Sequence, residues 1–133
     1  MVPHESNVKL PPILHIGQIV KDLDKTVEFY NSCGLGPFRV YELELKGCMY
    51  RGKPSDSRLK IGTTSGPPVG MELIQVLEGE LPHSDFFKEK GEGVHHLGFR
   101  VDDLEGRGFC PCFVRQFLAR RNSHTWEPKK LAV

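Results

Sequence analysis

Residues 94–104, Val94-His95-His96-Leu97-Gly98-Phe99-Arg100-Val101-Asp102-Asp103-Leu104, decide the fold because a similar stretch occurs earlier in the chain. Residues 14–23, Leu14-His15-Ile16-Gly17-Gln18-Ile19-Val20-Lys21-Asp22-Leu23, repeat it 81 positions upstream. The identical pairs are His15 and His96, Gly17 and Gly98, Val20 and Val101, Asp22 and Asp103, and Leu23 and Leu104. Such a repeat at a fixed distance indicates an internal duplication. Each copy is typical of a strand followed by the acidic start of a helix, so we expect two equivalent strands that each carry one histidine.

Length and charge set the outer limits of the interpretation. A chain of 133 residues is long enough for one domain with a hydrophobic core. The net charge of +1 gives no bulk attraction to nucleic acid. No apolar run approaches the ~20 residues that a membrane span needs, and the first residues lack the pattern of a secretory signal. We therefore expect a cytoplasmic protein with neither a nucleic-acid nor a membrane partner.

Hydrophobic periodicity predicts an α+β fold. Alternation predicts four strands, over residues 13–20, 38–45, 58–63 and 69–76. Leu23, Val27 and Tyr30 have helical spacing after a cap at Asp22 or Asp24. The alternation in 38–45 slips, which predicts a bulge near Val40 and Tyr41. We also expect a polar loop over residues 47–57 and, over 81–93, a short helix capped by Ser84 and ended by Gly91.

The predicted elements divide the chain into four parts. Residues 1–11 are a tail, 12–80 a first βαβββ module, 81–93 a linker with the short helix, and 94–133 an incomplete second module. In the second module, glycines at 106 and 108 interrupt the expected helix, at roughly 1 kcal/mol each. The run 112–121 fits both a helix and a strand.

Three side chains from three predicted strands are candidates for a metal site. Glu72 shares a strand face with apolar neighbours, and a carboxylate there must be exposed, paired or metal-bound. Alternation puts His95 on the core face with Leu97 and leaves His96 on a more open face. His15 occupies the place of His96 in the first copy. Two imidazoles and one carboxylate form a ligand set that suits a divalent ion with open positions for substrate oxygens.

These motifs resemble the vicinal oxygen chelate superfamily, which has the glyoxalase and bleomycin-resistance fold. The residues that carry the resemblance are Leu14-His15-Ile16, Met71-Glu72-Leu73-Ile74 and His95-His96-Leu97-Gly98-Phe99. Residues 91–96 and 101–104 are similar to methylmalonyl-CoA epimerases and to lactoylglutathione lyase-like proteins. The resemblance implies paired βαβββ modules that enclose a metal cleft, with His15, Glu72 and His96 as ligands.

The resemblance also implies a fourth ligand, a glutamate on the last strand of the second module. The repeat distance would place this glutamate at about position 153, beyond Val133. The late carboxylate Glu127 lies beside a proline in a polar segment and is not a candidate. We therefore expect a shortened second module and a homodimer that shelters the exposed sheet edge.

The expected activity is epimerisation or isomerisation of an acyl thioester. The resemblance implies a divalent ion (cobalt, manganese, nickel or zinc) and removal of the proton next to a thioester carbonyl. Glu42 and Glu44 are candidates for the general base, and the sequence leaves open which of them points inward. The expected substrate is an acyl-CoA or a thiol adduct. The alternatives are a lactoylglutathione lyase-type glyoxalase, a related dioxygenase, and a non-catalytic small-molecule binding protein of the bleomycin-resistance type.

Overall fold

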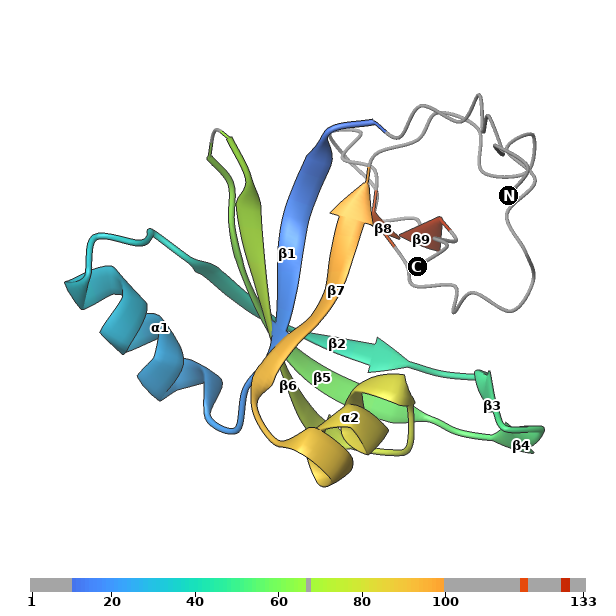
Figure 1. Ribbon diagram of the computed structural model, residues 1–133. Helices are drawn as coiled ribbons and strands as arrows, with labels where there is room; N and C mark the ends of the chain where they lie inside the picture. The colour runs from blue at the N-terminus through green and yellow to red at the C-terminus, as the bar shows by residue number, and fades with distance from the viewer. Residues whose placement is uncertain (1–10, 67, 100–117, 120–127, 130–133) are drawn as a thin grey trace, which may run out of the picture. The chain divides into compact units, whose positions relative to one another are not determined.

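A sheet with one helix on each face carries the candidate site (Figure 1). The computed structural model describes residues 11–66, 68–99, 118–119 and 128–129. Within the compact unit Ile13–Gly98 the elements follow in the order β1 (Ile13–Ile19), α1 (Leu23–Ser32), β2 (Arg39–Leu45), β3 (Met49–Tyr50), β4 (Lys53–Pro54), β5 (Ser57–Thr64), β6 (Gly70–Glu78), α2 (Pro82–Lys90) and β7 (Gly93–Phe99). The short strands β8 (Leu118–Ala119) and β9 (Pro128–Lys129) pair with each other. The predicted α+β class is confirmed.

Five strands form one sheet in the order β2-β5-β6-β1-β7. β2, β5 and β6 pair antiparallel, whereas β1 pairs parallel with β6. β7 comes from the second copy of the sequence repeat, and its hydrogen-bonded neighbour is β1 from the first copy. The two duplicated strands therefore lie side by side, which puts their histidines within reach of each other.

Helix α1 covers one face of the sheet. The Asp22 side chain caps the helix by accepting a hydrogen bond from the Lys25 amide at 3.1 Å. The predicted helical stripe packs as expected, because Leu23, Val20 and Leu73 form a buried cluster to which Val27 and Tyr30 add contacts. This face, with Leu73 at its centre, is called the α1 face below.

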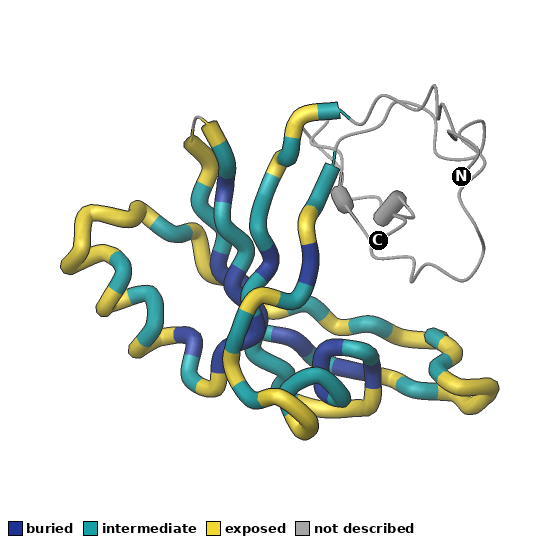
Figure 2. The backbone as a smooth tube through the Cα atoms, viewed as in Figure 1, coloured by how far each residue is buried: buried dark blue, intermediate teal, exposed yellow. Residues whose placement is uncertain are grey.

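Helix α2 covers the opposite face. Leu73 and Ile74 are consecutive on β6, so their side chains point to opposite faces of the sheet. Ile74 packs with Ile19, Leu59 and Ile61, and the aromatic residues Phe86 and Phe87 of α2 add to this cluster. This face is called the site face below. Figure 2 shows that burial concentrates where the central strands pass the two helices.

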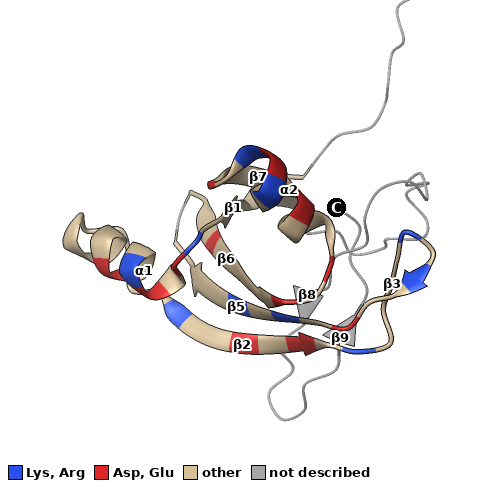
Figure 3. Cartoon of the chain, turned by 90° about the horizontal axis from the view of Figure 1, so that it is seen from below, with Lys and Arg blue, Asp and Glu red and all other residues tan. Residues whose placement is uncertain are grey.

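The predicted end of α2 at Gly91 is confirmed, but the predicted cap at its start is wrong, because the N-cap residue is Leu81 and not Ser84. Ser84 is the third residue of the helix, and its hydroxyl accepts a hydrogen bond from the Leu81 amide at 3.0 Å. Gly91 ends the helix with a φ of 76°, a conformation that glycine adopts without strain. Acidic and basic side chains alternate along both helices and do not separate by sign (Figure 3).

Two other local predictions are wrong. β2 and β5 pair in an unbroken register through Val40 and Tyr41, and the irregularity lies at Arg58/Leu59 in β5 instead. Leu43 and Leu45 pack against the core cluster, while Val40 in the other phase is exposed, so the two phases of apolar residues need no bulge. The loop predicted over 47–57 contains the small hairpin of β3 and β4.

Of the ambiguous run 112–121 the structure describes only Leu118–Ala119, which form a strand. The other predictions for the second module, including the position of Glu127, lie outside the described residues. Among the residues that the structure does describe, no helix has the length and apolar character to span a bilayer.

Candidate metal centre

His15, Glu72 and His96 converge from three neighbouring strands of the sheet. Gly17 on β1 is the register partner of Glu72 on β6, which brings the His15 side of β1 next to the carboxylate. Glu72 Oε2 lies 3.3 Å from His15 Nε2 and 3.1 Å from His96 Nε2. The two Nε2 atoms are 3.3 Å apart. All three predicted ligands therefore meet at one point on the site face.

The glycines of the repeat make room for the histidines of the opposite copy. A methyl group on Gly17 would lie within 2.5 Å of His96 ring atoms, and one on Gly98 would lie equally close to the His15 ring. Ordinary carbon contacts need about 3.5–4.0 Å. Each histidine thus fills the space above the glycine of the neighbouring strand, and this reciprocal contact explains the His-x-Gly spacing in both copies.

Burial and hydrogen bonding fix the charge state of Glu72. The exposed fraction of the side chain is 15% for His15, 16% for Glu72 and 3% for His96. Burial alone raises the pKa of the Glu72 carboxyl, but the hydrogen bonds and charges of His15 and His96 outweigh it and lower the pKa from 4.5 to about 2. Glu72 is therefore an anion throughout the physiological pH range.

The spacing of these three atoms fits a divalent metal ion. Two ligands that are each about 2.1 Å from an ion lie about 3.0 Å apart at a right angle and about 3.4 Å apart at a tetrahedral angle. The observed distances of 3.1–3.3 Å fall between these limits. Two imidazoles and one carboxylate suit zinc, cobalt, nickel or manganese. The donor atoms are thus already at ligand spacing, and all three come from strands rather than loops.

The structure reverses the predicted exposure of the paired histidines. We expected His96 on the more open face, but the residue is 7% exposed, whereas Leu97 beside it is 43% exposed. The His15 ring and the Glu72 carboxylate cover the His96 ring. His95 is the more exposed of the two histidines, and its ring lies 5.1 Å from the Phe86 ring. The pKa of His95 is lowered, mainly by burial and to a smaller extent by the charge of His96, which favours its neutral form.

Glu42 and Glu44 do not lie with these three residues. Glu42 is the register partner of Lys60, which is paired in turn with Gln75, and Gln75 accepts a hydrogen bond from the first residue of α1. Glu42 and Glu44 therefore lie on the α1 face. There Glu42 contacts Arg58 at 3.1 Å and Glu44 contacts Lys46 at 3.0 Å, both as exposed ion pairs.

The sequence analysis missed two residues that share a face with Glu72. Arg39 is the partner of Thr63, and Thr63 is the partner of Glu72, so all three side chains leave the same face. Tyr41 follows two positions after Arg39. Burial, and then the Glu72 charge, raise the pKa of the Tyr41 phenol. The sequence analysis predicted a bulge in this strand, and it therefore left open which β2 side chains share a face with Glu72.

Comparison with known proteins identifies the class. A sequence model of the Glyoxalase/Bleomycin resistance protein/Dioxygenase superfamily matches residues 14–107. The chain belongs to this superfamily, and the resemblance found in the sequence is confirmed. The match begins one residue before His15 and includes Glu72 and His96. The comparison with curated proteins found no match.

Solved structures of three proteins have a similar arrangement. A hypothetical protein from Bacillus halodurans is 26% identical with a TM-score of 0.49, and the match covers 71% of this chain but 62% of that one. Methylmalonyl-CoA epimerase from Mycobacterium tuberculosis is 20% identical with a TM-score of 0.49, and 92% and 77% of the two chains are covered. The Streptomyces coelicolor epimerase, solved in complex with 2-nitronate-propionyl-CoA, is 25% identical with a TM-score of 0.49 and coverages of 86% and 80%.

Proposed function

We propose that the protein is a divalent-metal-dependent epimerase or isomerase of acyl thioesters, of the methylmalonyl-CoA epimerase type. The observation that carries the proposal is the convergence of His15, Glu72 and His96, whose ligand atoms are 3.1–3.3 Å apart. Membership of the superfamily supports a metal centre at this place. The resemblance of residues 91–104 to the epimerases supports the choice of reaction.

The proposed reaction transfers the proton next to the thioester carbonyl to a base of the enzyme and returns it to either side of the same carbon. A divalent ion held by the three ligands would act as a Lewis acid that stabilises negative charge on the substrate oxygen. Glu72 and the two histidines hold their donor atoms in place before substrate arrives, so little reorganisation is needed. The base must reach the site face, and Glu42 and Glu44 lie on the other one. The proposal therefore assigns the proton transfer to neither of them.

Tyr41 and Arg39 are proposed to bind the substrate. The Tyr41 phenol, whose pKa is raised above its ordinary value of 10.0, is protonated at neutral pH like any tyrosine and can donate a hydrogen bond to a substrate oxygen. Arg39 is exposed on the same face and offers a cation to an anionic acyl group. Together with the Glu72 cluster they define a face that suits an acyl chain bearing a carboxylate.

We further propose that the ion is cobalt, manganese, nickel or zinc. The protein is proposed to act in the cytoplasm as a homodimer, with an acyl-CoA or a thiol adduct as substrate and no nucleic-acid or membrane partner. Val94 is 62% exposed and Leu97 is 43% exposed, and both lie on β7, which is an edge strand among the described strands. Apolar side chains exposed on an edge strand support pairing with a second copy.

Deuterium exchange tests the proposed function. With a divalent ion in deuterated water, methylmalonyl-CoA should take up one deuterium at its acidic carbon, as measured by mass spectrometry. His96→Ala should abolish the uptake, and Glu42→Gln should leave it unchanged as the control on the opposite face. No uptake, together with turnover of a methylglyoxal–thiol adduct, would replace the epimerase by the lyase.

Two other outcomes would assign the remaining candidates. Oxygen consumption with ferrous iron would favour the dioxygenase, since two histidines and one carboxylate also suit iron. Ligand affinity that survives chelator treatment, without turnover of either substrate, would favour the binding protein.

A further inference from the structure

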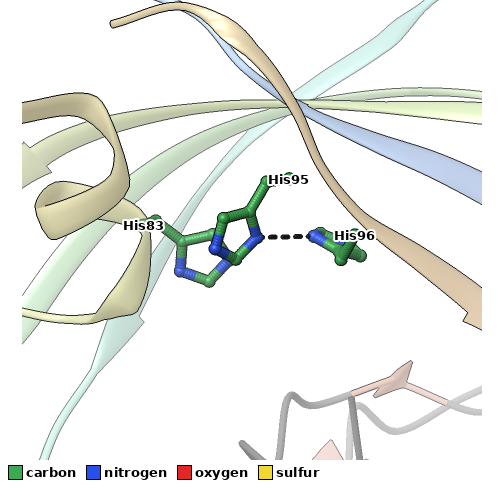
Figure 4. Close-up of side chains that lie close together, drawn as sticks. All are labelled: His83, His95 and His96. Carbon is green, nitrogen blue, oxygen red and sulfur yellow. Dashed lines mark hydrogen bonds between the residues drawn. The ribbon is translucent and has the colours of Figure 1, made fainter. Parts of the chain in front are cut away.

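A second group of imidazoles lies next to the His15–Glu72–His96 cluster. His83 is the second residue of α2, while His95 and His96 are consecutive on β7. Ligand atoms of these three histidines all lie within 4.8 Å of one another. Figure 4 shows the three rings together, with His95 and His96 joined by a close contact. The group joins helix α2 to the edge strand that carries His96.

The two ring nitrogens of His96 face different neighbours. Its Nε2 lies 3.1 Å from Glu72 Oε2 and 3.3 Å from His15 Nε2. Its Nδ1 lies 3.1 Å from His95 Nδ1. The His96 ring is nearly perpendicular to the rings of His95 and His83, at 86° and 81°. One imidazole therefore stands between two sets of potential ligands.

The histidines of this second group are largely shielded from solvent. His83 is 3% exposed and His96 is 7% exposed, and Phe86 covers the His95 ring edge to face. The centroids of the His83 and His95 rings are 4.7 Å apart. Small side-chain rotations would bring such rings to the spacing of about 3.0–3.4 Å that ligands of one ion adopt.

We infer that His83, His95 and the Nδ1 side of His96 form a second binding site for a divalent transition-metal ion. A set of imidazoles without a carboxylate suits zinc, cobalt, nickel or copper and disfavours magnesium and calcium. This site goes beyond the proposed function and does not depend on it. A neutral imidazole offers one lone pair, so the two sites compete for His96 unless the ring releases its proton and bridges them.

The test separates the two sites by mutation. In His15→Ala/Glu72→Ala, which removes two ligands of the first centre, zinc titration should still give one bound ion per chain, measured by calorimetry and metal content. Adding His83→Ala should weaken this binding at least tenfold. Adding His83→Cys, which restores a metal donor, should recover it. Lys88→Ala on the same helix is the control and should have no effect.

Two results would overturn the inference. The first is a double variant that folds, by circular dichroism, but binds no more zinc than His96→Ala does. The second is a double variant whose affinity is indifferent to His83→Ala. If the double variant does not fold, nitrogen NMR of the single variant His15→Ala with excess zinc decides, since the ring signals of His83 should shift and unmoved signals would refute the site. Loss of deuterium exchange would count against the proposed function and leave these results unaffected.

Discussion

The depressed pKa of Glu72 makes a prediction about stability at acid pH. In the metal-free protein the carboxyl pKa is lowered from 4.5 to about 2. At 1.36 kcal/mol per pKa unit, this difference corresponds to about 3 kcal/mol. A depressed pKa contributes stability that is present above the unfolded pKa and is lost as the pH falls through the folded pKa. The contribution is therefore nearly complete at pH 5, and about 2 kcal/mol of it should be lost by about pH 2.5.

Glu72→Gln removes this term and leaves the other carboxylates in place. We expect the free energy of unfolding, measured by urea denaturation after chelator treatment, to fall less steeply between these pH values in the variant than in the wild type. Glu42→Gln is the matched control, because its ion pair with Arg58 is on the surface and such pairs contribute little. Identical acid profiles for Glu72→Gln and the wild type would show that the two histidines do not hold the carboxylate.

Three further predictions concern the metal centre and the assembly. His15→Ala and His96→Ala should each lose the ion of the first centre, whereas His95→Ala should keep the ion and lose stability. Zinc titration measures the first effect and urea denaturation the second. Loss of zinc in His95→Ala but not in His96→Ala would show that the assignment of the β7 faces is wrong. Gly17→Ala should displace the His96 ring, and Gly98→Ala the His15 ring, by about 1 Å. Each change should weaken metal binding by about 10–100-fold, the range seen when a residue that orients a metal ligand is lost. Unchanged affinity would refute the reciprocal packing. Sedimentation at micromolar concentration should show a dimer, and a monomer that binds metal tightly would contradict the proposed pairing.

The repeat was the part of the sequence that predicted most. Two strands with the same His-x-Gly spacing indicated equivalent ligands, and the structure puts β1 and β7 side by side with the histidines in contact. The site face of β6 also followed from alternation, since Glu72 was expected to share its face with Ile74. Alternation alone places Glu72 and Ile74 on one face, although β6 is buried on both faces, at Leu73 as well as at Ile74.

Sequence patterns failed on β2, a largely exposed strand at the edge of the described sheet. β2 carries apolar residues in both phases, so alternation could not show whether Glu42 or Tyr41 faces Glu72. His83 gave no signal either, because a single histidine near the start of a short helix has no periodicity of its own. Its place beside His95 depends on how α2 packs on the sheet, which is a tertiary property.

The close fit of His15 and His96 over the opposite glycines links the duplication to the chemistry. If either glycine carried a side chain, one ring would have to leave, and Glu72 would lose one of the two partners that hold it as an anion. A buried carboxylate without such partners would rise in pKa and become a poorer ligand. The histidine of one copy and the glycine of the other are therefore required together. The same constraint favours neighbouring positions for the two strands, because only there can each copy provide the space that the other copy needs.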